Sequence, residues 1–244
     1  MDNQQSKFDF RTGELLLVDK PIGWTSFDVV AKLRNAITRF ERHFRPDLPG
    51  RIKVGHSGTL DPLATGLLII ATGKKTKELE SFQGLDKSYS ATIKLGAETA
   101  SYDAETAEEN IKTTDHITAE LLEVEIQKFR GAIAQKPPIF SAVKVEGVRL
   151  YQHARVGEVV ERPTRYVTIY KFELEKINLP EIEADINCSK GTYIRSIAHD
   201  LGQELNTGAY LTALRRTSVG DFFIEQAWQL DELLAILEKR EDAK

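Results

Sequence analysis

The chain has 244 residues, a formal net charge of −4 at neutral pH and 29% charged residues. This length suits one large domain or two small ones, and 41% hydrophobic residues are enough for a core. No apolar run approaches the roughly 18 residues of a membrane span, and the polar tail at 1–13 is neither a signal peptide nor a transit peptide. The single cysteine, Cys188, excludes an internal disulfide. We therefore expect a cytoplasmic protein.

Charge is unevenly distributed along the chain. From Glu98 to Glu125 there are nine acidic residues and one lysine, whereas from Lys32 to Lys53 there are seven Lys or Arg residues and two acidic ones. A basic region on an otherwise acidic protein is compatible with binding a phosphate backbone at one face. A solvated helix surface explains the same charges equally well, so charge alone leaves both interpretations open.

The chain begins with a predicted strand and a long helix. The apolar run at 14–18 predicts a buried strand that ends at the polar and Pro-containing sequence 19–21. Thr25 or Ser26 then caps a helix, because the apolar residues that follow recur at helical spacing. The next segment, 55–66, is so rich in Gly, Thr and Pro that we expect it to be irregular.

The rest of the chain alternates strands and helices without an internal repeat. The acidic segment 98–115 predicts a solvated loop, and 141–151 predicts a hairpin turning at 146–147 before a short helix. Further strands are predicted at 67–71, 87–96, 165–177 and 181–188, and helices at 118–131, at 192–205 and after Trp228. Because strands outnumber helices and several form hairpins, we predict an α+β fold with a mixed, mainly antiparallel sheet and flanking helices.

Several enzyme signatures are absent from the sequence. Six residues separate Gly66 from Gly73, whereas a phosphate-binding loop needs four. Ser57 lies between glycines, but Thr59 stands where the serine-hydrolase turn needs glycine. The histidines form no pair at metal-ligand spacing; they are at positions 43, 56, 116, 153 and 199. The sequence therefore suggests no metal site.

The segment GHSGTLDPLATG at 55–66 combines residues that suit a binding or catalytic loop. Its glycines let the backbone approach a ligand closely, and Pro62 fixes the chain directly after Asp61. A carboxylate held in this way can act as a nucleophile or a base, although an Asp before Pro more often only stabilises a turn. His56 alone is a weaker candidate, because most such histidines are hydrogen-bonded loop residues.

The longer segment GHSGTLDPLATGLLIIATGKKTK, at 55–77, resembles the signature of the TruB-type tRNA pseudouridine synthases. Five other segments resemble motifs of that family, in the family's order: LLVDKPIGWTS (16–26), KSYSATIKLG (87–96), PPIFSAVKVEGVRLYQHARVG (137–157), CSKGTYIRSIAHDLG (188–202) and LRRTSVG (214–220). The resemblance implies a pseudouridine synthase catalytic domain at 14–225 with an RNA-gripping thumb at 137–157. The remaining residues, 226–244, would form a C-terminal helix and tail without the PUA domain that many relatives carry.

The resemblance also implies an activity, the isomerisation of uridine 55 in the T arm of tRNA to pseudouridine, without cofactor or metal. By its match to GTLDP, Asp61 is the nucleophile, acting either by addition to the base or through a glycal. Arg195 would lie near Asp61 and favour its charged form. Tyr89 would stack on the flipped base and act in deprotonation.

Four further residues match family positions that contact the substrate. Tyr193 and Leu214 would line the uridine pocket, and His56 would fill the space left by the extruded base. Lys20 would lie near the motif loop and make a structural or phosphate contact. Extrusion costs a few kcal/mol, which aromatic stacking of roughly 1–3 kcal/mol per base partly offsets. Basic residues expected to contact phosphates are Arg34, Arg39, Arg42, Arg45, Lys53, Lys74, Lys75 and Lys77.

Two other functions share these features. A guide-RNA-dependent synthase of the archaeal and eukaryotic type needs partner proteins and a larger C-terminal domain. A tRNA-folding chaperone would use the same surface but would not need Asp61. We expect a monomer that binds tRNA, with no membrane and no obligatory protein partner; the basic stretch 39–51 has no assigned role.

Overall fold

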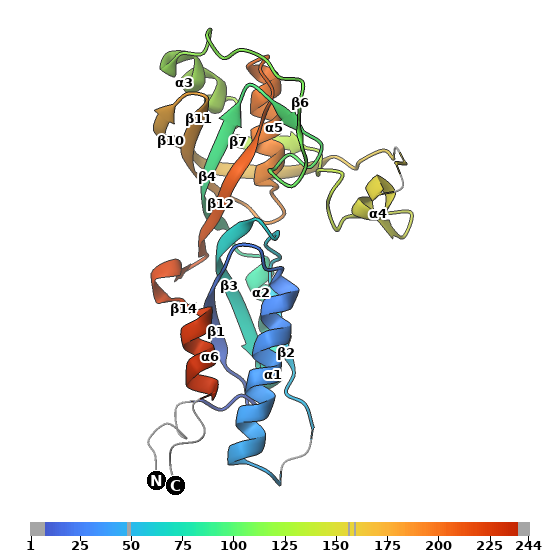
Figure 1. The fold of residues 1–244 in the computed structure, drawn as a ribbon, viewed down its shortest axis with the longest axis vertical. Helices are drawn as coiled ribbons and strands as arrows, with labels where there is room; N and C mark the ends of the chain where they lie inside the picture. The colour runs from blue at the N-terminus through green and yellow to red at the C-terminus, as the bar shows by residue number, and fades with distance from the viewer. Residues whose placement is uncertain (1–7, 48–49, 156, 159, 239–244) are drawn as a thin grey trace. The chain divides into compact units, whose positions relative to one another are not determined.

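The computed structural model describes residues 8–47, 50–155, 157–158 and 160–238 (Figure 1). Its contacts divide the chain into two compact units, which are described separately below. The first unit comprises Met1–Leu85 and Arg215–Lys244, and the second comprises Asp86–Leu214. In the part of the chain that the structure describes, no helix has the length and apolar character needed to cross a bilayer.

Both ends of the chain contribute to the first unit. Its elements are β1 (Leu15–Lys20), α1 (Ser26–Phe44), β2 (Val54–Ser57), β3 (Ala64–Thr72), η1 (Gly73–Glu78), α2 (Leu79–Gln83), β13 (Phe222–Phe223), η2 (Ile224–Gln226), β14 (Trp228–Gln229) and α6 (Leu230–Glu238). The strand order is β14-β1-β3-β12, with β2 on β3 and β13 on β12 (Ala209–Val219), a strand that contributes to both units. β1 pairs antiparallel with β3 and parallel with β14.

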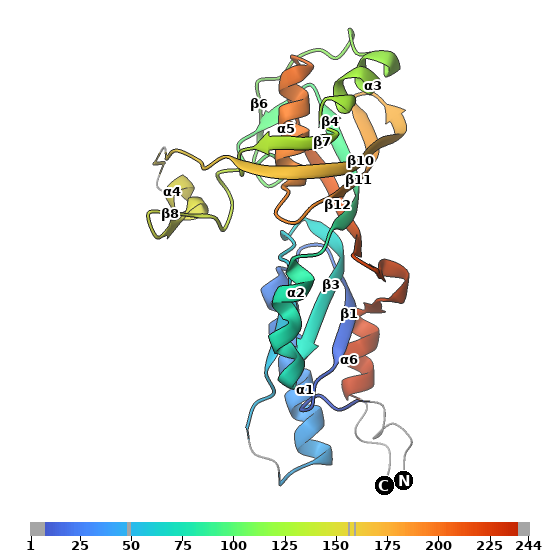
Figure 2. The same cartoon turned by 180° about the vertical axis from the view of Figure 1, so that it is seen from behind.

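Helix α1 begins as the sequence predicts. The Thr25 hydroxyl accepts from the backbone N–H of Asp28 (3.0 Å), and the Asp28 carboxylate accepts from the N–H of Thr25 (2.9 Å). This capping box satisfies two N–H groups that the helix itself leaves unpaired. The apolar side of α1 packs with α6 on one face of the strands, whereas α2 lies over the other face (Figures 1 and 2).

The second unit is built on antiparallel strands in the order β12-β4-β11-β10-β7. Its elements are β4 (Lys87–Leu95), β5 (Glu98–Thr99), β6 (Glu108–Glu109), α3 (Ala119–Gln127), β7 (Gly131–Gln135), β8 (Lys144–Val145), β9 (Val148–Arg149), α4 (Leu150–Arg155), β10 (Arg165–Asn178), β11 (Glu181–Cys188) and α5 (Ile194–Glu204). Alternate residues of β4 and β11 are buried, as expected of strands with one covered face. The predicted α+β class with a mainly antiparallel sheet is confirmed.

Most predicted elements are present, including the hairpin at 141–151. Its turn residues Glu146 and Gly147 have φ values of 52° and 85°, which suit the tight turn between β8 and β9. The prediction that 55–66 is irregular is wrong at both ends, because β2 covers 54–57 and β3 begins at Ala64. Within the acidic segment the short strands β5 and β6 pair, and the sequence pattern predicted neither β7 nor β12.

Candidate active site

Asp61 lies on a loop of the first unit, residues 58–63, which we call the Asp61 loop. Its backbone forms a turn in which the N–H of Ala64 donates to the carbonyl of Asp61 (3.1 Å), with Pro62 in the second position. Proline suits this position because its fixed φ matches the turn. The Asp61 side chain is half-buried. The local sequence therefore holds the carboxylate on a short, restrained loop rather than on a flexible connection.

Two buried side chains of the first unit hold this loop from within. The hydroxyl of Ser26 accepts from the N–H of Leu60 (2.8 Å) and donates to its carbonyl (3.2 Å). The guanidinium of Arg216 donates to the carbonyls of Gly58 (3.1 Å) and Leu67 (2.7 Å). Arg216 is only 1% exposed, so its hydrogen bonds are shielded from competition with water.

Lys20 provides a third anchor. Its side chain is fully buried, and its ammonium donates to three backbone carbonyls: those of Pro21 (3.0 Å), Trp24 (2.6 Å) and Pro62 (3.4 Å). Burial lowers the pKa of Lys20 to about 8, although the negative charge of Asp61 opposes this shift. Lys20 therefore has a structural contact near the motif loop, as the resemblance allowed, and its contact with substrate stays a prediction.

The lowered pKa of Lys20 predicts a pH dependence of stability. Between pH 8 and 10.5 the unfolded chain keeps the Lys20 proton while the folded chain releases it, so the free energy of unfolding rises with pH in that window. Subtracting the free energy of unfolding of Lys20→Met from that of the wild type should give a value that rises with pH by up to about 1.4 kcal/mol per pH unit. Urea unfolding followed by tryptophan fluorescence measures it, since both tryptophans, Trp24 and Trp228, lie in the first unit. A constant difference across the window would contradict the prediction.

His56 is also in the first unit, on β2, where it pairs with Ile70 of β3. It is half-buried. Burial lowers the pKa of His56, and the positive charge of Arg216 lowers it further, so the imidazole is neutral at neutral pH. A neutral ring is suited to the space-filling role that the resemblance implies, and that role stays a prediction.

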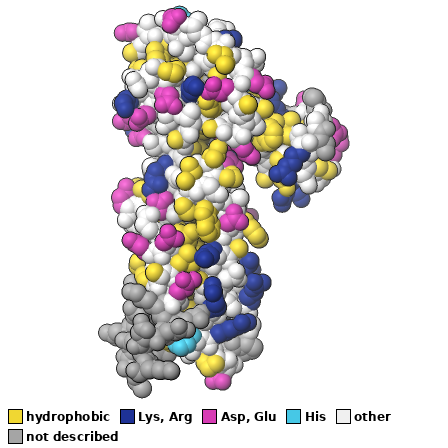
Figure 3. All heavy atoms as spheres, in the orientation of Figure 1, with side chains coloured by type: hydrophobic (Ala, Val, Ile, Leu, Met, Phe, Trp, Pro, Cys, Tyr) yellow, Lys and Arg dark blue, Asp and Glu magenta, His cyan; other side chains and the backbone are white. Residues whose placement is uncertain are grey.

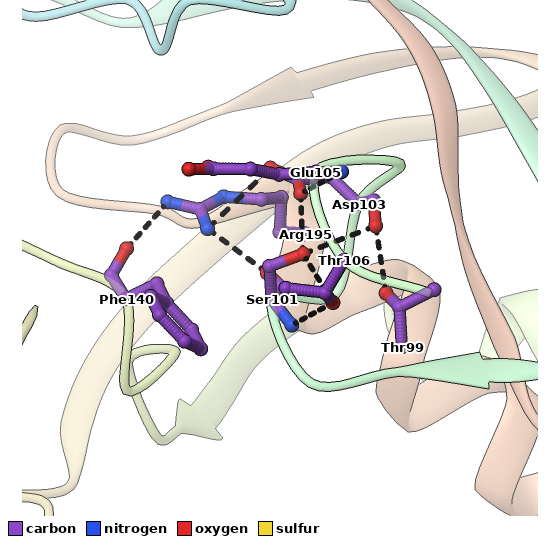
Figure 4. Close-up of polar contacts among 7 residues, drawn as sticks. All are labelled: Thr99, Ser101, Asp103, Glu105, Thr106, Phe140 and Arg195. Carbon is purple, nitrogen blue, oxygen red and sulfur yellow. Dashed lines mark hydrogen bonds and ion pairs between the residues drawn. The ribbon is translucent and has the colours of Figure 1, made fainter. Parts of the chain in front are cut away.

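Arg195 is held by a polar network in the second unit (Figure 4). Its guanidinium donates to the carbonyls of Ser101 (2.9 Å) and Phe140 (2.9 Å) and lies 3.5 Å from the carboxylate of Asp103. Asp103 in turn accepts from the hydroxyl of Ser101 (2.6 Å) and the N–H of Glu105 (3.0 Å). Arg195 is 5% exposed, so the network fixes the direction in which its guanidinium points.

The other candidates of the second unit lie on α5 and on two neighbouring strands. Tyr193 precedes α5, and the buried Gln135 side chain binds both its backbone N–H (2.8 Å) and its carbonyl (3.0 Å). Tyr89 is on β4, opposite Ile186 of β11, and is 9% exposed. Leu214 is half-buried on β12, which neighbours β4.

The candidate residues therefore form two groups. Lys20, His56 and Asp61 belong to the first unit, and the structure brings them together around the Asp61 loop. The group in the second unit is Tyr89, Tyr193, Arg195 and Leu214. The expected pairing of Arg195 with Asp61 joins residues of different units and stays a prediction.

Part of the basic stretch 39–51 has a structural role. Arg45 and Arg11 both lie within ion-pair distance of the buried carboxylate of Glu41 (3.7 and 3.2 Å). Arg39 approaches Glu238 at 3.8 Å. Figure 3 shows Lys and Arg side chains gathered on the α1 side of the first unit. Arg42, on α1, and Lys53, directly before β2, are exposed and suit contact with a polyanion.

Sequence reasoning missed several residues that support the candidate site. Arg216 and Ser26 lie inside two of the quoted family segments, so their positions were available, but nothing in the sequence predicted their burial beneath the Asp61 loop. Gln135 and Asp103 lie outside those segments and gave no signal. Among the residues that the structure describes, no group of three or more His, Cys, Asp or Glu side chains is arranged to hold a metal ion.

Comparison with known proteins identifies the relatives of this chain. The model of the TruB family pseudouridylate synthase N-terminal domain matches residues 46–194, and that of the tRNA pseudouridylate synthase B C-terminal domain matches 195–244. A tRNA pseudouridine synthase B of Flavobacterium johnsoniae is 49% identical, covering 90% of this chain and 93% of that protein. One of Chloroherpeton thalassium is 48% identical, covering 95% and 93%.

Solved structures agree with these matches at lower sequence identity. A chain in the crystal structure of a Cbf5-Nop10-Gar1 complex is 28% identical with a TM-score of 0.68, covering 92% of this chain and 54% of that one. A chain in an H/ACA RNP bound to a substrate RNA containing 2′-deoxyuridine is 25% identical with a TM-score of 0.64, covering 90% and 52%. This chain thus spans about half the length of those solved chains.

Proposed function

This chain belongs to the TruB family of pseudouridylate synthases, and we propose that it isomerises uridine 55 in the T arm of tRNA to pseudouridine, with Asp61 as nucleophile. Its relatives at 48–49% identity are tRNA pseudouridine synthases B over nearly their whole length. Activity as an isomerase acting on tRNA follows from this kinship. The position of the uridine and the role of Asp61 are the finer parts of the proposal.

The observation that carries the proposal is the support of the Asp61 loop. Three buried side chains, Ser26, Lys20 and Arg216, fix the backbone on both sides of Asp61 by hydrogen bonds. A nucleophile works best when it is held in position before the substrate arrives, because the cost of orienting it is then not met during the reaction. A loop aspartate with only a turn-forming role would not require such support.

The reaction needs no oxidant, reductant or second substrate. The bond between C1′ of the ribose and N1 of uracil breaks, the base rotates, and a bond forms between C1′ and C5. C5 loses its hydrogen as a proton, and N1 acquires one, so product and substrate are isomers. An ionised Asp61 begins this sequence by adding to the base or by promoting a glycal, and a base such as Tyr89 assists removal of the C5 proton.

Binding of tRNA through the basic side of α1 predicts a dependence on salt. Each phosphate contact releases counterions, so replacing one contacting residue lowers the slope of log Kd against log [KCl] by about 0.7–0.9. Arg42→Ala and Lys53→Ala should each reduce the slope by this amount. Lys176→Ala is the matched control, because Lys176 is exposed on β10 and paired with Glu183 (3.4 Å). Equal slopes for all four proteins would exclude this surface as the RNA contact.

Tritium release tests the function directly. A tRNA transcript labelled with [5-³H]uridine should lose label when incubated with the protein, because isomerisation removes the hydrogen from C5. A transcript with cytidine in place of uridine 55 is the matched control and should release nothing. Release from both transcripts would support pseudouridine synthase activity but show that uridine 55 is not the residue that is modified. No release from either transcript would favour the tRNA chaperone function.

A guide-RNA-dependent synthase is the second enzyme function that these comparisons raise. The resemblance to Cbf5 is 28% in identity and covers about half of that chain, whereas the relatives at 48–49% match over most of their length. We therefore expect release of tritium from tRNA by the protein alone. Activity that appears only after a guide RNA is added would reverse this assignment.

A further inference from the structure

The second unit contains a polar cavity that the proposed reaction does not use. Its volume is about 280 Å³, and its charged and polar lining includes Tyr102, Lys136, Arg162, His199 and Asp200. His199 and Asp200 lie on α5, one turn beyond the candidate catalytic residue Arg195. The cavity is therefore close to the candidate site in the same unit.

Tyr102 is held in an unusual conformation at the wall of this cavity. Its φ of 64° is in the left-handed region, which is unfavourable for a tyrosine. The ring stacks on His199 with centroids 3.8 Å apart and planes at 10°, and its hydroxyl accepts from Arg162 (3.1 Å). The neighbours Ser101 and Asp103 bind Arg195, so one short loop shapes both the cavity and the Arg195 network.

The charges around the cavity suit a ligand that carries both a hydrogen-bond donor and an anionic group. Burial raises the pKa of Asp200 to about 6, against the attraction of Arg162, so the carboxylate is largely ionised at neutral pH. Within the described residues the side-chain carboxylate of Asp200 makes no hydrogen bond. Lys136 is exposed, and Arg162 donates from a single nitrogen, Nη1, to the hydroxyl of Tyr102 and the carbonyl of Pro137. Burial lowers the pKa of His199, which is therefore neutral.

We propose that this cavity binds the ribose-phosphate unit of an RNA nucleotide other than the reacting uridine. The carboxylate of Asp200 accepts a hydrogen bond from the 2′-hydroxyl, and Lys136 and Arg162 bind the adjacent phosphate. A free phosphate alone would not suit the site, because Asp200 would repel it. The 2′-hydroxyl is the group by which a protein distinguishes RNA from DNA, so the cavity would contribute to that choice. This inference rests on the proposed action on tRNA.

The test combines a protein variant with a series of modified RNAs. The probes are T-arm stem-loops, each with a single 2′-deoxynucleotide outside the reacting position, and the readout is Kd for the full chain. Asp200→Asn should raise the Kd of the all-RNA stem-loop about tenfold, the usual effect of losing a hydrogen bond to a charged group. One deoxy substitution should weaken the wild type similarly and have a clearly smaller effect on Asp200→Asn, because asparagine keeps only a neutral and weaker acceptor for the same 2′-hydroxyl.

Glu204→Gln is the matched control. Glu204 is a half-exposed carboxylate on the same helix that pairs with Lys128 (3.1 Å) outside the cavity lining, so its variant should bind RNA like the wild type. Tighter binding by Asp200→Asn would mean that only phosphate lies nearby, and would overturn the proposal. The same holds if no deoxy position is coupled to Asp200. The deoxy series on the wild type remains informative even if a variant misfolds.

Failure of this inference is distinguishable from failure of the proposed function. Wild-type release of tritium without any coupling between Asp200 and a 2′-hydroxyl would reject the cavity alone. Absence of tritium release from every RNA would reject the synthase function, whatever the binding data show.

Discussion

Asp61→Asn is expected to abolish pseudouridine formation while leaving the fold and tRNA binding intact. Asparagine has nearly the same shape as aspartate, and it keeps the backbone carbonyl through which Asp61 accepts the hydrogen bond of the turn. The amide is not a nucleophile, so the rate of tritium release should fall by about 10³-fold or more. The buried anchors Ser26 and Arg216 remain in place, which predicts unchanged circular dichroism and an unchanged Kd for tRNA.

Asp221→Asn is the control for this variant. Asp221 is an exposed carboxylate of the first unit, in the turn between β12 and β13, so its replacement should alter neither rate nor stability. Full activity of Asp61→Asn would be consistent with the proposed enzyme activity but would show that Asp61 is not its nucleophile. A variant that loses its fold along with its activity would show that the carboxylate is mainly structural.

Gly66→Ala should strongly destabilise the first unit. Gly66 has a φ of +101°, and a Cβ built there would lie 2.3 Å from the carbonyl oxygen of Arg216 and 2.7 Å from its N–H nitrogen. Both neighbours are backbone atoms of the adjacent strand and cannot move without breaking the pairing of β3 with β12. We expect a loss of about 4 kcal/mol or more in the free energy of unfolding, the size that marks severe packing errors.

Gly50→Ala separates the two causes of this loss. Gly50 has nearly the same φ, +97°, but a Cβ there would meet no atom of the described residues within 4 Å. Only the strain of the left-handed backbone applies, which is about 1–2 kcal/mol. Urea unfolding followed by tryptophan fluorescence measures both variants. Similar losses for the two would mean that strain, not the contact with Arg216, explains the need for glycine at position 66.

The sequence predicted those elements whose pattern depends on apolar spacing. Helix α1 and the strands β4, β10 and β11 are examples, because the buried residues of the helix recur at helical spacing and those of the strands alternate with more exposed ones. β2 was missed because its pairing with β3 uses backbone hydrogen bonds, which leave no pattern in the sequence. Its glycine, Gly55, packs closely against Leu79: a Cβ at position 55 would lie 2.8 Å from Cδ1 of that leucine. Composition made this segment resemble a loop, whereas close packing required small residues in a strand.

The same limit applies to the candidate site. Residue types and motifs indicated Asp61, His56 and Lys20, because their chemistry is visible in a sequence. The burial of Arg216 and Ser26 beneath the Asp61 loop was not predictable, since Arg216 binds a carbonyl 158 positions away and Ser26 binds a residue 34 positions away. The cavity at Tyr102 and Asp200 likewise joins residues that no local pattern connects.

The first unit is built from two segments that lie on either side of the second unit in the sequence, and this arrangement affects folding during synthesis on the ribosome. Residues 86–214 form the second unit and are complete before the last part of the chain has emerged, so this unit can fold early. The first unit must wait for Arg215–Lys244, which supplies Arg216, the strand β14 and the helix α6. Asp61 is translated more than 150 residues before Arg216, so its loop gains its guanidinium anchor only after the whole second unit has been made. A nascent chain thus holds the Asp61 carboxylate on an incompletely supported loop until residues 215–244 have been translated.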